Sequence, residues 1–234
     1  GMTAGSRSWN AVAADNPGAL QAGTANPAAG GVIGFPQNAP LLFVVSGPSG
    51  VGKDSVVDRI RGAGVGLNVA VTCTTRRPRP AEIDGTHYHF RSPSEFESMI
   101  ACDELLEWAR VYDRYYGVPK FELQRAVIDR RDVVLKVDVQ GAATVRQKIP
   151  EAVLIFVAPS SYGELMDRLA GRATEDAENL ALRLETAHQE METLGQFDYV
   201  VVNREGELDH AVGQIGAIVA AERCRVNPRV FTLP

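Results

Sequence analysis

Runs of consecutive apolar residues recur through the middle of the chain, and segments whose apolar positions have helical spacing separate them. Such runs, when only a few residues long, are typical of strands that are buried on both faces. They lie at residues 41–45, 67–72, 132–139, 152–158 and 197–203. The alternation of these strands with helices predicts an α/β fold, a three-layer core built on a five-stranded parallel, doubly wound sheet.

The intervening segments predict helices that each have one apolar side. A helix should follow the first strand to about residue 63, and another should span residues 119–130 with Leu123, Val127 and Ile128 turned inward. Further helices are expected at about 140–149, from 161, at about 176–194 and at 207–223. Residues 227–234 carry no informative pattern.

Residues 82–120 follow neither pattern for long. Alternating positions at 87–90 and 105–112 predict short strands, and the spacing from Ser94 to Glu97 is that of a capping box at the start of a short helix. We expect an inserted lobe of mixed α+β structure here, and not another parallel crossover unit.

Composition limits the domain organisation. With 234 residues, 45% of them apolar, the chain favours one domain with an inserted lobe. Residues 1–40 are rich in Ala, Gly, Pro and Asn and predict a flexible arm. A targeting peptide is the alternative, although Arg7 would be its single positive charge.

Charge and hydropathy exclude several partners and locations. A formal net charge of −5 argues against a general binder of nucleic acid or of anionic membranes. No apolar run approaches the roughly 18 residues of a membrane span, which favours a cytoplasmic protein. The three cysteines are widely spaced and suggest neither a disulfide framework nor a zinc site.

A glycine-rich loop after the first strand carries the strongest chemical signal. Residues 47–54 read Gly-Pro-Ser-Gly-Val-Gly-Lys-Asp and stand between a strand and a helix. Glycines that let backbone N–H groups converge, a lysine and a helix N-terminus form a cradle for nucleotide phosphates. The pattern is a Walker A loop in which Asp54 replaces the usual Ser or Thr; a simple strand-to-helix turn is the alternative.

A basic loop follows the second strand. Arg76, Arg77 and Arg79 lie within four positions, beside two prolines that forbid a regular helix. Guanidinium groups suit phosphate, and ligands bind at the carboxyl ends of strands in open α/β sheets. We favour a second phosphate site over a merely solvated loop, and this pairing suggests a donor nucleotide with a phosphorylated acceptor.

Other candidates have plainer alternatives. Glu107 stands among apolar residues and is either a carboxylate with a partner or an outward-facing strand residue. His87 and His89 are expected at the strand surface and not as metal ligands, because no carboxylate or cysteine cluster accompanies them. Arg168, Arg172 and Arg183 surround a break at Gly171 between two helices. Such a pair predicts a mobile lid, or else ion pairs with Glu175, Glu178 and Glu185.

Taken together, these motifs strongly resemble those of guanylate kinases over roughly residues 41–223. The resemblance rests on the order and spacing of short segments more than on any one of them. They are 46–53, 74–79, Gly85 with Tyr88 and Phe90, 107–109, 115–117, 137–141, 171–172 and 201–203.

The resemblance implies a P-loop NTPase-type core at 41–73 and 119–223, a GMP-binding lobe at about 74–118, a helical lid at about 168–183 and a tail at 224–234. It implies ATP binding by Gly47, Pro48, Ser49, Gly50, Val51, Gly52, Lys53, Asp54, Ser55 and Asn203. It implies GMP binding by Cys73, Arg76, Arg79, Tyr88, Glu107, Tyr116, Val118 and Asp138. Lys53, Arg76, Arg168, Arg172 and Arg183 would be catalytic.

The sequence departs from the family at several of these positions. Cys73 and Val118 stand where many relatives have a hydroxyl residue that assists guanine recognition, and loss of a neutral hydrogen bond costs on the order of 1 kcal/mol. Lys136 replaces a common acidic residue and could pair with a carboxylate or with phosphate. Asp54 could give Mg²⁺ a charged oxygen ligand.

The expected function is Mg-assisted transfer of the γ-phosphate of ATP to GMP, with Mg²⁺ entering as MgATP. No nucleic-acid or membrane partner is expected, and the protein should be a monomer or homodimer. A non-catalytic interaction domain of the same fold, or a kinase for another phosphorylated acceptor, are the alternatives.

Overall fold

The main sheet forms the centre of the part of the chain that the computed structural model describes, residues 39–111, 113–170 and 177–234. Its five strands are parallel and lie in the order β2-β7-β1-β8-β9. Their bounds are β1 Leu42–Ser46, β2 Leu67–Val69, β7 Asp132–Lys136, β8 Val153–Ala158 and β9 Tyr199–Val202. The predicted five-stranded parallel sheet is confirmed. The predicted arm lies outside the described residues except for its last two positions.

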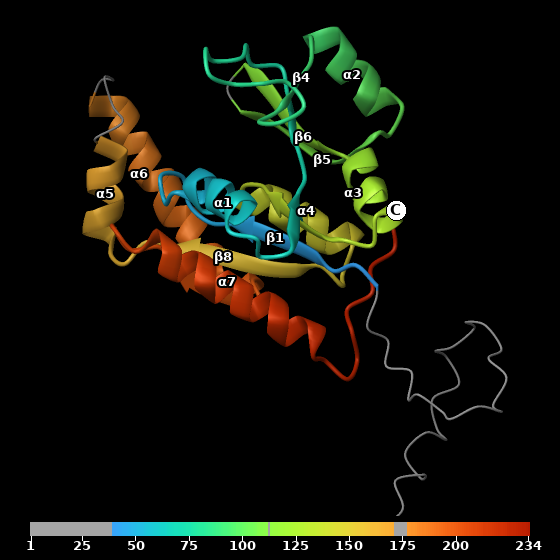
Figure 1. Ribbon diagram of the computed structural model, residues 1–234. Helices are drawn as coiled ribbons and strands as arrows, with labels where there is room; N and C mark the ends of the chain where they lie inside the picture. Colours follow the sequence, from blue (N-terminus) through green and yellow to red (C-terminus); the bar gives the residue numbers. More distant parts are fainter. Residues whose placement is uncertain (1–38, 112, 171–176) are drawn as a thin grey trace, which may run out of the picture. The chain divides into compact units, whose positions relative to one another are not determined.

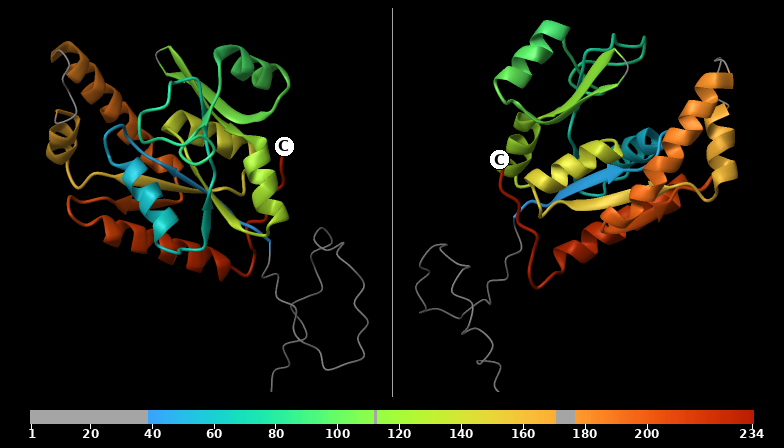
Figure 2. Two further views of the ribbon diagram at one scale, coloured as in Figure 1. Left: turned by 45° about the horizontal axis from the view of Figure 1, so that its top comes forward. Right: turned by 180° about the vertical axis from the view of Figure 1, so that it is seen from behind.

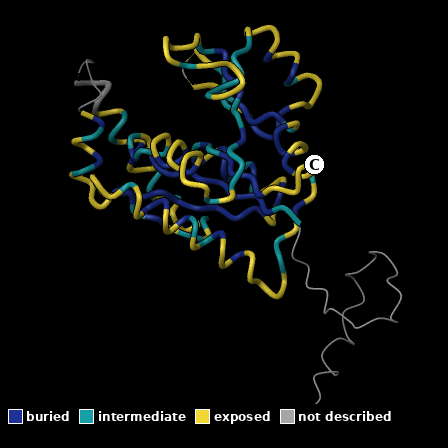
Figure 3. The backbone as a smooth tube through the Cα atoms, viewed as in Figure 1, coloured by how far each residue is buried: buried dark blue, intermediate teal, exposed yellow. Residues whose placement is uncertain are grey.

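Helices cover both faces of this sheet because the side chains of its strands alternate between two clusters. Phe43 and Val45 of β1 pack with α1 (Lys53–Gly62) and α7 (Leu208–Arg223). Leu42 and Val44 pack with α3 (Lys120–Ile128) and α4 (Val139–Lys148). Figure 1 shows β1 between these helices, and the strands are the most continuously buried segments in Figure 3. This arrangement sets the carboxyl ends of the strands at one edge.

A second, mixed sheet has the order β4-β3-β6-β5. Its strands are β3 Cys73–Thr74, β4 His89–Phe90, β5 Leu105–Val111 and β6 Arg114–Pro119. Helix α2 (Pro93–Ala101) packs Phe96 and Met99 against this sheet. Figure 2 shows the helix beside the sheet from two sides. The β3–β4 pair is parallel and the other two pairs are antiparallel. The predicted mixed elements are therefore present.

Two further helices pack on each other through a small apolar cluster. They are α5 (Tyr162–Ala170) and α6 (Ala177–Glu192), which is followed by the 3₁₀ helix η2 (Thr193–Gln196). Leu165 and Leu169 of α5 meet Ala187 of α6. Gly171 and Arg172, at the predicted break between these helices, lie outside the described residues. Within the described ranges, every helix is too short or too polar to span a bilayer.

The predicted inward face of α3 is wrong. Leu123 is buried, but Val127 is 38% exposed and Ile128 is 80% exposed, while Ala126 and Glu122 are buried instead. Ile128 follows Leu123 by five residues, so the two side chains point about 140° apart around the helix axis. The buried stripe is set by the tertiary contacts of α3.

The capping box of α2 begins two residues earlier in the sequence than predicted. Ser92 is the N-cap, its Oγ accepts from Glu95 N, and Glu95 Oε2 accepts from Ser92 N at 2.7 Å. The same Ser-x-x-Glu spacing therefore begins at Ser92. Pro93 occupies the first helical position, where its fixed φ suits a helix and its missing N–H costs nothing.

The C-terminal tail, in which the sequence shows no pattern, is anchored at two points. Phe231 is 6% exposed and joins the cluster beneath α3 and α4. Arg229 forms ion pairs with Asp198 at 3.2 Å and with Glu222 at 3.4 Å. The tail therefore completes the core, and does not merely trail from α7.

Truncation of this anchor should destabilise the protein. We expect Phe231→Ala to lower the free energy of unfolding by about 3 kcal/mol, because it leaves a cavity in a packed cluster. The matched control is Val226→Ala, whose side chain is 92% exposed in the same tail. Thermal unfolding of both variants checks the expectation, and equal midpoints would show that the tail contributes no packing.

Candidate functional site

The phosphate loop between β1 and α1 adopts a backbone that glycine alone accommodates easily. Gly50 and Gly52 have φ values of 83° and 92°, in the left-handed region. Added Cβ atoms would also stand 2.7 Å from Leu169 Cδ2 and 2.6 Å from Asn203 Nδ2. Helix α1 begins at Lys53, so its free N–H groups face the loop. The loop is thus built for an anion, as the motif predicts.

Lys53 folds back over this loop. Its Nζ donates to the carbonyl oxygens of Gly47 at 2.6 Å and of Pro48 at 2.9 Å. Burial lowers the pKa of Lys53, and the negative charges of Glu190 and Asp54 partly offset that effect. The side-chain nitrogen of Lys53 is therefore held at the loop by backbone carbonyl groups.

A carboxylate on α6 accepts a hydrogen bond from one backbone amide of the phosphate loop. Ser49 N donates to Glu190 Oε2 at 2.8 Å, across 141 positions of sequence. Burial raises the pKa of Glu190, whereas the Ser49 amide and the charge of Lys53 lower it. Sequence reasoning missed Glu190, because nothing in its spacing distinguishes it from the other acidic residues of that helix.

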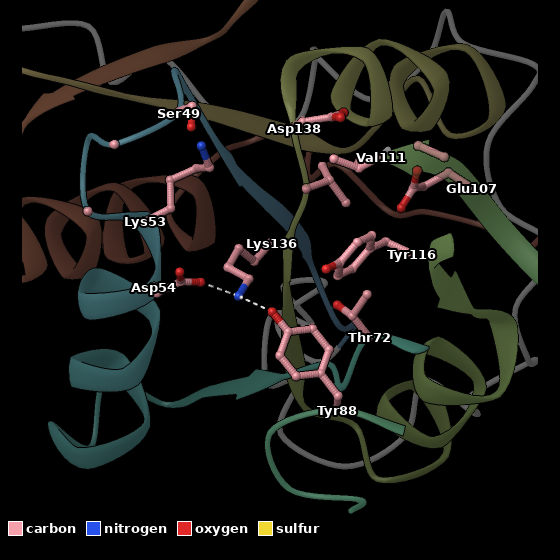
Figure 4. Close-up of a pocket in the computed structure, with 14 residues that line it drawn as sticks. Ser49, Lys53, Asp54, Thr72, Tyr88, Glu107, Val111, Tyr116, Lys136 and Asp138 are labelled. Carbon is pink, nitrogen blue, oxygen red and sulfur yellow. Dashed lines mark hydrogen bonds and ion pairs between the residues drawn. The ribbon is translucent and has the colours of Figure 1, made fainter. Parts of the chain in front are cut away.

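A cavity of about 290 Å³ extends from the phosphate loop toward the second sheet. Ser49, Lys53 and Asp54 line its end at the phosphate loop, whereas Glu107 and Asp138 line the opposite end. Figure 4 shows both groups of side chains around the same space. The structure therefore brings part of the predicted ATP set and part of the predicted GMP set around one cavity. Thr72, Ala109 and Val111 also line it and were not predicted from the sequence.

Glu107 is buried, so the interpretation of an outward-facing strand residue is wrong. It is 7% exposed on β5. Burial, with a smaller contribution from the charge of Asp138, raises the pKa of Glu107 to about 8. The carboxyl group is therefore largely protonated near neutral pH. The bulge between Leu105 and Glu107 sets the register at this position.

Asp138 has a structural contact as well. It is the N-cap of α4, and its Oδ1 accepts from Gly141 N at 2.7 Å. A Cβ at Gly141 would stand 3.0 Å from Glu107 Oε2 and 3.2 Å from Asp138 Oδ1. Glycine at this position therefore lets the two carboxyl groups lie close beside the helix N-terminus, which favours negative charge.

A second cavity, of about 370 Å³, contains the predicted arginine clamp. Arg76, Arg79, Tyr88 and Tyr116 line it together with Glu82. Arg76 makes two hydrogen bonds to the Glu82 carboxylate, at 2.9 and 2.8 Å. These contacts lower the pKa of Glu82 to about 2. The Arg76 guanidinium also lies over the rings of Tyr88 and Phe90. It is thus held in place and is not a freely solvated arginine.

A third cavity, of about 450 Å³, lies along the other side of the phosphate loop. Ser55, Arg168 and Asn203 are among its lining residues. Arg168 Nη1 and Asn203 Nδ2 both donate to Val51 O, at 2.9 and 2.8 Å. Arg168 also forms an ion pair with Glu164, which is not one of the partners expected from the sequence.

The remaining predicted residues lie apart from these cavities or outside the described chain. Cys73 is fully buried in the cluster with Phe96, and burial raises the pKa of its thiol to about 11. Val118 is also buried, at 1% exposure, and neither residue lines the three cavities. Arg183 is half-buried on α6 and does not line them either. Arg172 lies outside the described residues.

His89 lies in β4 of the second sheet, and His87 lies in the turn before it. The described residues hold no group of three or more metal-binding side chains. His89 was expected at the strand surface, but it is half-buried, because its Nε2 lies 2.9 Å from Glu122 Oε1. Glu122 Oε2 also accepts from Val71 N at 3.2 Å, so this pair ties α3 to the second sheet.

Comparisons with known proteins agree with one another. The family model described as guanylate kinase matches residues 40–222. A guanylate kinase of Desulfitobacterium hafniense is 46% identical, covering 83% of this chain and 98% of its own. Guanylate kinase 2, chloroplastic/mitochondrial, of rice is 43% identical, covering 85% and 70%. The crystal structure of guanylate kinase from Anaplasma phagocytophilum matches with a TM-score of 0.66 and 28% identity, covering 81% and 89%.

Glu190 should compete with anions for the phosphate loop. We expect Glu190→Ala to tighten ATP binding about fivefold in the presence of EDTA, because a contact worth on the order of 1 kcal/mol no longer has to be broken. Fluorescence titration with a labelled ATP analogue measures this affinity. Glu192→Ala, an exposed position on the same helix, is the matched control and should change nothing. Unchanged or weaker binding in Glu190→Ala would contradict the expectation.

Proposed function

Because the chain belongs to the guanylate kinase family, we propose that it transfers the γ-phosphate of ATP to GMP and releases ADP and GDP. The observation that carries this proposal is a single cavity with the phosphate loop and Lys53 at one end and the carboxyl groups of Glu107 and Asp138 at the other. A donor phosphate and an acceptor base can be held there at the same time. Positioning of the two substrates is the main requirement of phosphoryl transfer.

The donor side is supplied by the loop, by Lys53 and by the third cavity. Backbone N–H groups and the Lys53 ammonium offset the charge that spreads over the phosphoryl oxygens. The adenine would lie near Asn203, which the resemblance assigns to it and which lines the cavity beyond Gly52. Arg168 stands at the same edge of the loop and can turn toward the phosphates.

Mg²⁺ would enter with ATP. Magnesium usually binds through one or two carboxylates and substrate phosphates, and not in an all-protein cage. The described residues hold no three-residue cluster, but the Asp54 carboxylate stands at the mouth of the loop. This donor set fits Mg²⁺, with Asp54 as its protein ligand. Bound there, the ion would neutralise phosphate charge.

The acceptor side offers acidic groups to the base and basic groups to the phosphate. Guanine presents its N1–H and N2–H as donors, and a carboxylate can accept from both, whereas adenine lacks that pair. Asp138 is placed for this contact, and so is Glu107, which accepts from both donors once its carboxyl group has lost its proton. Arg76, Arg79, Tyr88 and Tyr116 surround the second cavity, which continues from the first and suits the GMP phosphate. The GMP phosphate is the nucleophile, so no strong base is needed.

Location and assembly complete the proposal. We keep the cytoplasmic location and the monomeric or homodimeric state as predictions from the sequence. The described residues show intact loop glycines and Lys53 at the loop, which supports catalysis over a purely binding role. The lid, including Arg172 and Arg183, is proposed to close over the phosphates and exclude water.

A coupled assay for ADP across a panel of nucleoside monophosphates tests the proposal. We expect ADP to form on addition of GMP and Mg²⁺, with much less from AMP, CMP or UMP. No ADP from any acceptor would support the non-catalytic interaction domain. A preference for a different phosphorylated acceptor would support the third interpretation, a kinase of other specificity.

The Glu107→Gln substitution should impair the use of GMP. The amide has one acceptor in place of two, so we expect kcat/KM for GMP to fall roughly 100-fold, since hydrogen bonds to a charged group are worth about 1.5–3 kcal/mol each. Affinity for ATP should be nearly unchanged. Unchanged selectivity across the acceptor panel would exclude Glu107 from recognition of the base.

The same variant should be more stable than the parent at alkaline pH. The pKa of Glu107 in the folded protein is about 8, above its ordinary value of 4.5, so ionisation of the carboxyl group costs stability as pH rises through this window. Glutamine carries no such cost. We expect the midpoint of thermal unfolding to rise by at least about 4 °C at pH 9 and to change little at pH 5. Equal shifts at both pH values would contradict the burial argument.

A further inference from the structure

Lys136 lies where the first and second cavities meet. It is the last residue of β7, and it lines both cavities together with Asp54 and Tyr88. Its Nζ forms an ion pair with the Asp54 carboxylate and donates to the Tyr88 hydroxyl at 3.4 Å. Figure 4 shows the lysine between these two side chains. Lys136 therefore connects the phosphate loop with the acceptor half of the site.

The charges of this pair are arranged unusually for a phosphate loop. In P-loop NTPases generally, a neutral hydroxyl follows the loop lysine, and an acidic residue at the end of a neighbouring strand helps to hold the metal. Here α1 carries the carboxylate, and β7, which pairs directly with β1, carries a cation. Compared with that arrangement, the residue after the loop lysine is acidic here, and the residue at the end of the neighbouring strand is basic.

This exchange has an electrostatic consequence. An uncompensated Asp54 would repel the polyphosphate of ATP at close range. The Lys136 side chain is 23% exposed and the Asp54 side chain is 67% exposed, so the lysine is the better shielded partner. The ion pair places the positive charge of the lysine directly at the Asp54 carboxylate.

We propose that Lys136 is a positioning residue with two tasks: it neutralises Asp54 at the donor phosphates, and it holds Tyr88 at the acceptor phosphate. Neither task requires Lys136 to touch a reacting atom. The first task rests only on nucleotide binding to the phosphate loop. The second rests on the proposed function, because it requires that the acceptor phosphate binds beside Tyr88.

The first task is tested by binding of a fluorescent ATP analogue in EDTA, where no metal can offset the charge of Asp54. We expect Lys136→Met to weaken binding about tenfold, Lys136→Arg to bind nearly as the parent does, and Asp54→Ser to bind at least as well. The decisive variant is Asp54→Ser combined with Lys136→Met, which should recover binding to within about twofold of Asp54→Ser alone. If the double variant binds as weakly as Lys136→Met, the lysine acts on the nucleotide directly and the proposal is overturned.

A matched control removes a different paired lysine. Lys120 forms an ion pair with Asp103 at 2.7 Å and is absent from the linings of the first and second cavities. Lys120→Met changes the net charge by the same amount and should leave ATP binding unchanged. If Lys120→Met lost as much affinity for the ATP analogue as Lys136→Met does, the loss would reflect the overall charge of the protein, and the proposal would be overturned. Thermal unfolding confirms that each variant is folded.

The second task is tested by GMP binding in a double-mutant cycle of Lys136→Met and Tyr88→Phe, measured by calorimetry without ATP. Because the two side chains are in contact, we expect the double variant to lose less affinity than the product of the two single losses. Independent losses would overturn this part. If the parent binds GMP but forms no ADP in the coupled assay, the proposed function fails while both binding results still stand.

Discussion

The conformation of the phosphate loop is the constraint on which the other parts of the site depend. Its glycines take left-handed backbone angles that cost other residues on the order of 1 kcal/mol or more. The Val51 carbonyl within it accepts from both Arg168 and Asn203. The loop is therefore fixed by β1 at one end, by α1 at the other, and by the α5 and β9 regions from the side. These contacts position the loop relative to α5 and to the residue that follows β9.

Much of this organisation could be predicted from the sequence because it rests on local patterns. Continuous apolar runs identified the five strands of the parallel sheet, and the phosphate loop was recognised from residues that are adjacent in the chain. Family membership was predicted from the spacing of short motifs, and the comparisons confirm it. The first cavity also follows from the fold. The phosphate loop follows β1 and Asp138 follows β7, and these two strands are parallel neighbours.

The rest depends on contacts between distant segments, for which the sequence carries no local signal. Glu190 reaches Ser49 across 141 positions, and Asp54 reaches Lys136 across 82. The direction of Ile128 depends on how α3 lies against the sheet, and the burial of Phe231 depends on the groove that other helices leave. For Cys73 and Val118 a local signal was present but did not describe their surroundings. The resemblance implied that both residues bind GMP, whereas the structure places their side chains in the core.

Several charged groups of the site pair with one another. Arg76 pairs with Glu82, Arg168 with Glu164, and the Ser49 amide with Glu190. A guanidinium group has five N–H donors, so a phosphate could bind Arg76 beside Glu82, whereas the Ser49 amide has a single N–H that an anion would have to take over from Glu190. The carboxylate partners of the arginines therefore fix the direction of the guanidinium groups, and Glu190 is the carboxylate with which an incoming anion would compete.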